Sequence, residues 1–120
     1  MRFGVDLDGT VFEMGGLKFY DPKSIGVPYP GVREVLMALI NAGHEVVIYS
    51  CRMNPEYEGN NPYNVEELIY MVRGHLIENK IPFSDVSAYK PVCDYYLDDR
   101  NLVYSTWLDF GNMLRRLGII

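Results

Sequence analysis

The chain has 120 residues, of which 48% are hydrophobic and 22% are charged, and its formal net charge is −5. This composition excludes a disordered chain, a collagen-like repeat and a coiled coil. The length predicts one domain over residues 1–120 that buries roughly two-thirds of its unfolded surface. The excess of acidic residues argues against a broad basic face for extended nucleic acid, because phosphate binding requires clustered Lys and Arg.

The cysteines and the start of the chain indicate where the protein resides. Cys51 and Cys93 are too few for a disulfide scaffold, and both lie beside strand-like runs, which favours small buried hydrophobic side chains in a reducing compartment. Residues 1–5 lead directly into a strand-like run, and no apolar stretch approaches membrane-spanning length. We therefore expect a cytoplasmic protein that does not enter a membrane.

The first half of the chain predicts two strands separated by a loop region and a helix. Residues 2–6 are a short apolar run that stops at the turn-like sequence Asp-Leu-Asp-Gly-Thr. Residues 11–30 contain enough Gly and Pro to predict loop or a small hairpin. A helix then runs from Gly31 to Gly43, with apolar residues at i, i+3, i+4, i+7 and i+8. Residues 45–50 are the second apolar strand.

The second half predicts two more strands and two more helices. A polar loop leads to a helix whose start is marked by Asn64 as N-cap and Glu67 as its capping-box partner. Residues 82–88 are a weak strand candidate and residues 94–97 a clearer one. The core side of the first of these helices is expected at Val65, Leu68, Ile69, Val72, Leu76 and Ile77. The core side of the last helix is expected at Trp107, Leu108, Phe110, Leu114 and Leu117.

This alternation of strands and helices predicts an α/β fold with a single Rossmann-like parallel sheet, helices on both faces and right-handed crossovers. Ligands of such a sheet bind outside the carboxyl ends of the strands. Asp6 and Asp8 follow the first strand, and Asp98 and Asp99 follow the last. If these two strands are neighbours, four carboxylates converge. Such a cluster requires raised carboxyl pKa values or a cation, and a set of oxygen ligands with open positions suits Mg²⁺.

The polar residues at the strand ends also resemble the motifs of a known family. The Asp-Leu-Asp-Gly-Thr sequence at residues 6–10 resembles motif I of the haloacid dehalogenase (HAD) superfamily of phosphatases and phosphotransferases. The apolar strand closing on Ser50 resembles motif II, Lys90 resembles the motif III lysine, and residues 96–99 resemble the acidic motif IV. The four motifs occur in the family's order and span essentially the whole chain.

The resemblance implies a HAD-like hydrolase domain that cleaves phosphomonoesters. Asp6 would be the nucleophile that forms an aspartyl-phosphate. Asp8 would protonate the leaving group and then activate the water that cleaves the intermediate. Ser50 would hydrogen-bond the transferring phosphoryl group, and Lys90 would neutralise its growing charge. The presence of Asp8 resembles the phosphatase branch of the family, because the dehalogenase branch lacks this second acid.

The resemblance also implies a Mg²⁺ cofactor and a substrate-binding set. Mg²⁺ would be held by Asp6, the backbone carbonyl of Asp8 and Asp99, with Asp98 assisting directly or through water. Gly9 would allow the sharp turn that brings Asp8 inward. Substrate binding is assigned to Gly9, Thr10, Cys51, Arg52 and Arg100.

Two features depart from the family pattern. In many members the motif III lysine lies well upstream of motif IV, at a helix start, whereas here seven residues separate Lys90 from Asp98, and Lys80 is the alternative. The usual insertion points for a cap domain hold only short loops. The chain therefore resembles the capless members, whose open sites accept larger or terminal phosphates or borrow a lid from a neighbouring subunit, which leaves a homo-oligomer open.

The sequence leaves more than one substrate and more than one class of function open. Candidate substrates are a nucleotide, a polynucleotide end and a small phosphorylated metabolite. Arg52 and Arg100 either contact the substrate phosphate or pair with nearby carboxylates. Two other functions compete with a phosphatase: a receiver-like phospho-acceptor signalling module, and a catalytically silent HAD fold used for binding. Receiver modules carry an acidic pair on the first strand and a lone acceptor Asp on a later strand, and the Asp-x-Asp-Gly-Thr spacing at Asp6 and Asp8 argues against that order. All side chains that the reaction requires are present, which argues against a catalytically silent protein.

Overall fold

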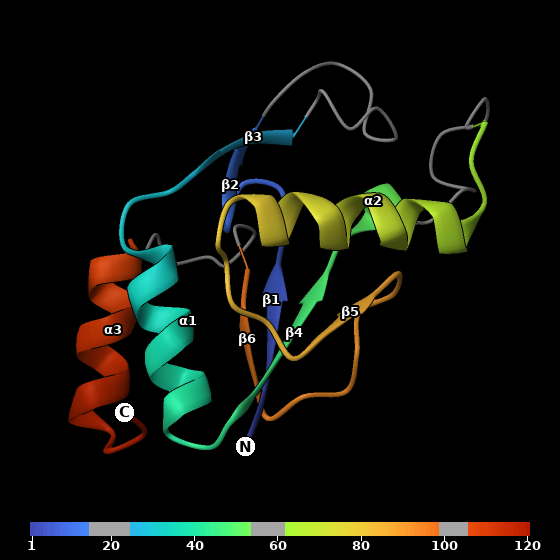
Figure 1. The fold of residues 1–120 in the computed structure, drawn as a ribbon. Helices are drawn as coiled ribbons and strands as arrows, with labels where there is room; N and C mark the ends of the chain where they lie inside the picture. The colour runs from blue at the N-terminus through green and yellow to red at the C-terminus, as the bar shows by residue number, and fades with distance from the viewer. Residues whose placement is uncertain (15–24, 54–61, 99–105) are drawn as a thin grey trace.

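The computed structural model describes residues 1–14, 25–53, 62–98 and 106–120. Figure 1 shows the arrangement of their strands and helices. The strands are β1 (Arg2–Asp6), β2 (Phe12–Met14), β3 (Ile25–Pro28), β4 (Glu45–Tyr49), β5 (Asp85–Ser87) and β6 (Tyr95–Leu97). The helices are α1 (Val32–Asn41), the short 3₁₀ helix η2 (Cys51–Met53), α2 (Val65–Glu78) and α3 (Trp107–Arg116).

Four strands form a parallel sheet in the order β5-β4-β1-β6, so that β1 lies between β4 and β6. The register pairs Asp6 with Tyr49 on β4 and Val5 with Leu97 on β6. Because parallel strands in this register end at the same level, the carboxyl ends of β1, β4 and β6 meet at one edge of the sheet. This confirms the predicted α/β class with a parallel sheet. It also shows that the first and last strands are neighbours, which the sequence analysis stated only as a condition.

The helix starts follow local sequence signals. The Asn64 side chain accepts a hydrogen bond from the Glu67 backbone N–H, and the Glu67 carboxylate accepts one from the Asn64 N–H, so the predicted capping box at α2 is present. Gly31 before α1 and Gly43 after it both have a left-handed backbone, with φ of 88° and 90°. These glycines set the two ends of α1 because other residues adopt that conformation at a cost.

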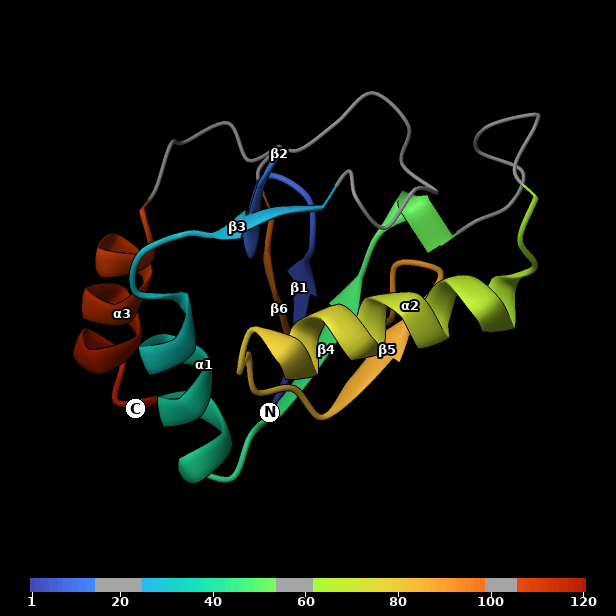
Figure 2. The same cartoon turned by 45° about the horizontal axis from the view of Figure 1, so that its top comes forward.

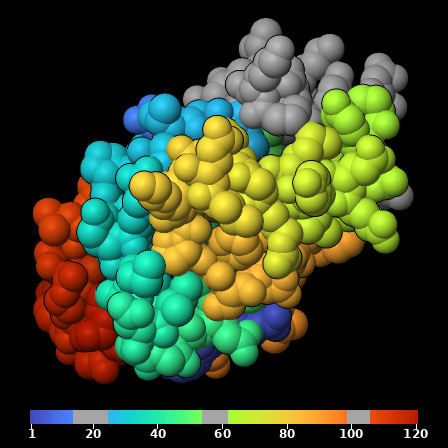
Figure 3. All heavy atoms as spheres, viewed as in Figure 1, coloured from blue at the N-terminus to red at the C-terminus, as the bar shows by residue number. Residues whose placement is uncertain are grey.

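All three α-helices contribute buried residues to one hydrophobic core. The strand side chains in this core belong to one face of the sheet and include Phe3, Val5, Val46, Ile48 and Leu97. In the space-filling view, atoms of α1 and α2 hide much of β1 and β4 (Figure 3). The sequence predicts helices on both faces of the sheet. In the structure, the buried residues of all three α-helices pack into the same core.

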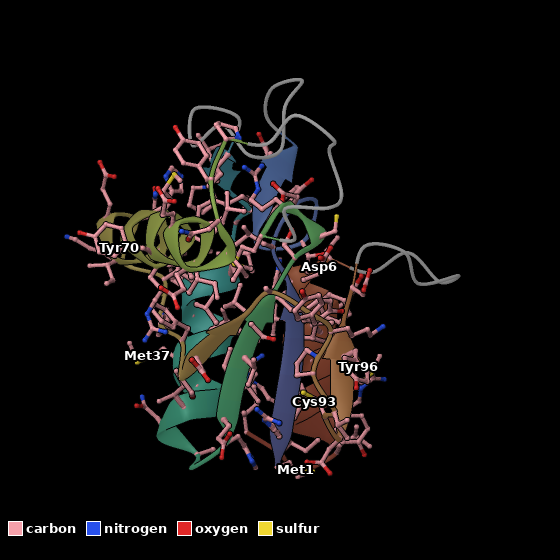
Figure 4. The ribbon with its side chains drawn as sticks, turned by 90° about the vertical axis from the view of Figure 1, so that its right-hand side faces the viewer. Met1, Asp6, Met37, Tyr70, Cys93 and Tyr96 are labelled. Carbon is pink, nitrogen blue, oxygen red and sulfur yellow. The ribbon has the colours of Figure 1, made fainter. Side chains whose placement is uncertain are left out.

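The opposite face of the sheet carries a different set of side chains. Val47 and Tyr49 are buried but lie outside the shared core, and they alternate with Val46 and Ile48 along β4. Tyr96 and Cys93 lie on this side, beside β1 (Figure 4). This face carries the site described below.

Three residues expected in the core are exposed. Ile77 on α2, Leu108 on α3 and Leu117 directly after α3 have 67%, 70% and 60% of their surface accessible. Leu76 and Trp107, the neighbours of Ile77 and Leu108 in sequence, are buried. Adjacent helical residues point about 100° apart, so the two members of an apolar pair can differ in burial. A continuous apolar pair in a helix does not by itself say which residue is buried.

The sequence predicts loop or a small hairpin from residue 11 to residue 30, and the described parts of this segment form a two-stranded antiparallel sheet. β2 and β3 lie beyond the carboxyl end of β1 (Figure 2). Tyr29 N–H donates to the Val11 carbonyl at 2.9 Å, which ties the end of β3 back to the turn after β1. The described part of this segment is thus a small element at the edge of the sheet where ligands are expected.

None of the described helices is long and apolar enough to span a membrane.

The close approach of Tyr96 to Gly4, its partner on β1, makes Gly4 sensitive to substitution. A Cβ atom at Gly4 would lie 2.7 Å from Tyr96 Cδ1 and 3.2 Å from Cys93 Sγ. Gly4→Ala is therefore expected to destabilise the protein by about 1–3 kcal/mol, through overpacking on this face. Urea unfolding measures the change.

Gly74→Ala is the matched control for this substitution. Gly74 is an exposed residue of α2, and a Cβ atom added to it would meet no atom within 4 Å. Replacing a helical glycine in open space should stabilise the protein by about 0.5–1 kcal/mol. Equal unfolding midpoints for the two variants would contradict the packing described here.

Candidate active site

The turn after β1 separates the two acids of the first motif. Leu7 N–H donates to the Tyr49 carbonyl at 3.0 Å, which extends the pairing of β1 with β4 past Asp6. Gly9 has a φ of 82°, and its N–H donates to the Phe12 carbonyl at 2.8 Å. The expected sharp turn at Gly9 is thus present, and glycine suits it because the backbone is left-handed there. The carboxylates of Asp6 and Asp8 enter two different environments.

The Asp8 carboxylate lies in a buried ion pair with Arg52. Arg52 Nε donates to Asp8 Oδ2 and Arg52 Nη2 donates to Oδ1, both at 2.7 Å. Ser50 Oγ also donates to Oδ2, at 3.1 Å. Asp8 is 7% exposed and Arg52 is 4% exposed. A bidentate guanidinium–carboxylate pair of this kind combines charge with fixed geometry, so Arg52 determines the orientation of Asp8.

Ser50 connects the two partners of this pair. Its hydroxyl donates to Asp8 and accepts a hydrogen bond from the Arg52 backbone N–H at 3.2 Å. η2 begins directly after Ser50, which brings Arg52 back toward the end of β1. Of the two roles considered for Arg52, pairing with a carboxylate is the one that the structure shows.

Asp6 and Asp98 lie in the second environment, on the opposite face from the core. Asp6 directly follows Val5, and Asp98 directly follows Leu97, the residue paired with Val5. Since side chains alternate along a strand, Asp6 and Asp98 point to the same side. Figure 4 shows Asp6 at the carboxyl end of β1. Asp6 also accepts a hydrogen bond from Thr10 Oγ1 at 3.4 Å.

Tyr49 lies between these two acids. Its hydroxyl donates to Asp98 Oδ2 at 2.7 Å, and its backbone is the register partner of Asp6. Burial, the hydrogen bond to Asp98 and the negative charges of Asp98 and Asp6 all raise the pKa of the Tyr49 phenol. The phenol therefore stays protonated and serves as a hydrogen-bond donor at neutral pH.

Lys90 reaches the same carboxylate as Tyr49. Its Nζ lies 3.9 Å from Asp98 Oδ2 and 4.5 Å from the centre of the Tyr96 ring. Lys80, the alternative lysine, lies in the turn after α2 with a left-handed φ of 58°. The short connection between β5 and β6 thus brings Lys90 to the site without a helix.

The remaining predicted residues fall into three groups. Thr10 is buried, and its carbonyl accepts a hydrogen bond from the Trp107 indole at 2.7 Å, so α3 supports the turn after β1. Cys51 is exposed at the start of η2, and the expectation that it is a buried hydrophobic residue is wrong. Asp99 and Arg100 lie outside the described residues.

The expected convergence of four carboxylates is therefore reached only in part among the described residues. Asp6 and Asp98 share a face, and Asp8 is engaged by Arg52 in a separate environment. The described part of the chain contains no group of three or more His, Cys, Asp or Glu side chains arranged to hold a metal ion. The two carboxylates of Asp6 and Asp98 are hard oxygen donors, which is the chemistry that Mg²⁺ prefers. They fit a site in which water and substrate oxygens supply further ligands.

Sequence reasoning missed Tyr49, and it left the pairing of Arg52 with a carboxylate as one of two alternatives. Tyr49 looked like an ordinary apolar residue of the second strand, because nothing along the chain says that it faces Asp98, 49 residues away. Its position next to Ser50 on the predicted strand was the available signal. The Arg52 pairing could be anticipated only as one of two alternatives, because it depends on the turn that η2 makes.

The comparisons with known proteins support the fold. The chain is similar to a protein from Vibrio cholerae of known crystal structure, with 26% sequence identity over 98% of this chain and 93% of that chain and a TM-score of 0.62. That protein is described as a target for structure determination, without an activity. No protein-family model and no curated protein matches the chain.

We expect the buried ion pair to dominate the stability of the site. Arg52→Met leaves the Asp8 carboxylate buried without its cation, and removing one partner of a buried pair costs about 3–5 kcal/mol. The double variant Asp8→Asn/Arg52→Met removes the stranded charge, so it should unfold at a higher urea concentration than Arg52→Met alone. Additive losses in the double-mutant cycle would show that the two side chains are not coupled.

Proposed function

We propose that this chain is a Mg²⁺-dependent phosphatase of the haloacid dehalogenase type, which hydrolyses phosphomonoesters through an aspartyl-phosphate on Asp6. The observation that carries the proposal is the position of Asp6 and Asp98 on one face at the ends of adjacent strands, with Lys90 Nζ 3.9 Å from Asp98. A carboxylate nucleophile, a second carboxylate for the cation and an ammonium group are what phosphoryl transfer requires in one place.

The order of the four motifs supports the same reaction. Asp6 would attack the phosphorus atom, and the ester P–O bond would break as Asp8 gives a proton to the leaving oxygen. A water molecule would then attack the phosphorus of the aspartyl-phosphate and give a proton to Asp8, which releases inorganic phosphate and restores the Asp6 carboxylate. Lys90 and Ser50 would stabilise the phosphoryl oxygens by charge and hydrogen bonding. Mg²⁺, when bound, supplies positive charge that offsets the carboxylates and the phosphoryl group.

The acid–base role of Asp8 requires one of its present contacts to open. Its carboxylate accepts hydrogen bonds from Arg52 Nε, Arg52 Nη2 and Ser50 Oγ. To deliver a proton, one carboxylate oxygen must exchange such a contact for the leaving oxygen of the substrate. Ser50 is suited to this exchange, because the same hydroxyl is expected to turn toward the phosphoryl group. Arg52 would keep its two hydrogen bonds, from Nε to Oδ2 and from Nη2 to Oδ1, and so preserve the orientation of Asp8.

The substrate class follows from the charge and from the small element beside the site. A net charge of −5 disfavours binding of a long polynucleotide. The described part of the segment where a cap would be inserted is a two-stranded antiparallel sheet, which favours an open site. A nucleotide, a polynucleotide end or a small phosphorylated metabolite fits such a site. A receiver-like module and a silent binding protein are the alternatives that the next experiments separate.

Asp6→Asn is expected to reduce Mg²⁺-dependent hydrolysis of p-nitrophenyl phosphate to background, because the amide cannot act as the nucleophile. The absorbance of the released p-nitrophenol measures turnover. Asp85→Asn is the matched control, since Asp85 is an exposed acid at the start of β5, away from the carboxyl ends of the strands. Activity retained in Asp6→Asn would refute the assignment. A stable phosphoprotein after treatment of the wild-type chain with acetyl phosphate would instead favour a receiver-like module.

Mg²⁺ is expected to raise the melting temperature of the wild-type chain, because the ion binds the folded carboxylates and not the unfolded chain. Binding raises the free energy of unfolding by about 2.7 kcal/mol when the Mg²⁺ concentration is 100 times the dissociation constant. Differential scanning fluorimetry measures the shift against NaCl of equal ionic strength, which controls for screening. A melting temperature unaffected by millimolar Mg²⁺ would contradict the proposed cation site. A shift without any turnover of a broad phosphate panel would favour the silent binding protein.

A further inference from the structure

We propose that Tyr49 is a positioning residue for Asp98, which fixes that carboxylate for the Mg²⁺ site through its phenol hydroxyl. This inference rests on the proposed phosphatase function for the role of the cation, and on the geometry of β4 and β6 for the role of Tyr49. Neither the family motifs nor the sequence pattern assigns a role to this tyrosine. The residue is argued to act through Asp98 and not on the substrate.

Asp98 lies beyond the last residue of β6 that pairs with β1, so strand pairing does not hold its backbone. β6 ends at Leu97, so Asp98 is the first residue beyond the paired part of the strand. Tyr49 Oη donates to Asp98 Oδ2 at 2.7 Å, whereas Lys90 Nζ approaches the same oxygen at 3.9 Å. The shorter contact comes from a ring on a central strand, and the longer one comes from a flexible side chain that is about half exposed. Tyr49 is therefore the better-defined restraint on the carboxylate.

The Tyr49 ring is itself held in place. Tyr49 is 6% exposed, and its ring packs edge-on against Tyr96, with centroids 6.3 Å apart and an interplanar angle of 88°. Gly4 makes room for this arrangement, because a Cβ atom there would overlap the Tyr96 ring. A hydrogen bond from a packed aromatic ring loses less conformational entropy than one from a long flexible chain.

A buried phenol in this position also needs a partner. Burying a hydroxyl without a hydrogen bond is unfavourable, and a bond from a hydroxyl to a charged carboxylate is stronger than a neutral one. The contact thus stabilises the orientation of the Asp98 carboxylate. Residues that orient metal ligands in this way typically contribute about 10–100-fold to metal affinity or activity.

Tyr49→Phe tests the assignment, because it removes the hydroxyl and keeps the ring. We expect the dissociation constant for Mg²⁺, measured by calorimetric titration of the substrate-free protein, to rise by about 10-fold or more. In the activity assay, the Mg²⁺ concentration for half-maximal rate should rise by a similar factor. Addition of saturating Mg²⁺ should restore most of kcat, because Asp6, Asp8 and Lys90 are unchanged.

Tyr96→Phe is the matched control on the same face of the sheet. The Tyr96 hydroxyl donates to the Pro91 carbonyl at 2.5 Å and accepts from the Cys93 N–H at 3.0 Å, so it contacts backbone and not a carboxylate. Both variants should lose stability in Mg²⁺-free urea unfolding, but only Tyr49→Phe should lose Mg²⁺ affinity. An unchanged or lower dissociation constant in Tyr49→Phe, or an equal rise in Tyr96→Phe, would overturn the proposal.

The outcomes separate this inference from the phosphatase assignment. If the wild-type chain hydrolyses phosphate and Tyr49→Phe binds Mg²⁺ as well as the wild type, the role of Tyr49 is refuted and the phosphatase assignment stands. If the wild-type chain is inactive on every phosphate tested but Tyr49→Phe weakens Mg²⁺ binding, the positioning role stands and the phosphatase assignment fails. A wild-type chain that binds no Mg²⁺ refutes the role of Tyr49.

Discussion

The pairing of β1 with β4 on one side and β6 on the other is the constraint on which the site depends. Hydrogen bonding in a parallel sheet fixes which residues lie at the same level, and here it places Asp6 beside Tyr49 and Val5 beside Leu97. A shift of one residue in either pairing would reverse the side to which Asp6 or Asp98 points. It would also move apolar side chains out of the core. The core and the site are thus specified by the same register.

The register divides the polar residues into two environments with different chemistry. On one side, Arg52 and Ser50 hold Asp8 in a buried network, where the low dielectric strengthens each contact. On the other side, Asp98 meets Tyr49 and the half-exposed Lys90 near Asp6. Two carboxylates with distinct surroundings suit a reaction that needs one acid as nucleophile and another as proton carrier.

Local signals predicted much of the fold. The capping box at Asn64 and Glu67 and the glycines around α1 depend on interactions between residues close in sequence, so they can be read without the tertiary structure. The apolar strands were also predictable, because their side chains are buried whatever their neighbours are. The same reasoning was wrong for Ile77 and Leu108, which lie next to buried residues and are themselves exposed. Apolar character alone does not determine the angle at which a helix meets the sheet.

By itself, the sequence determined the α/β class, the order of strands and helices, and the set of acids at the strand ends, because these follow from local periodicity and turn chemistry. Only the tertiary structure decided which of those groups meet. It brings Arg52 to Asp8 and Tyr49 to Asp98, contacts between residues 44 and 49 positions apart. Such contacts depend on strand register and on the turn at η2, and neither is written in the residues of one segment. The acids were visible in the chain, and the partners that orient them were not.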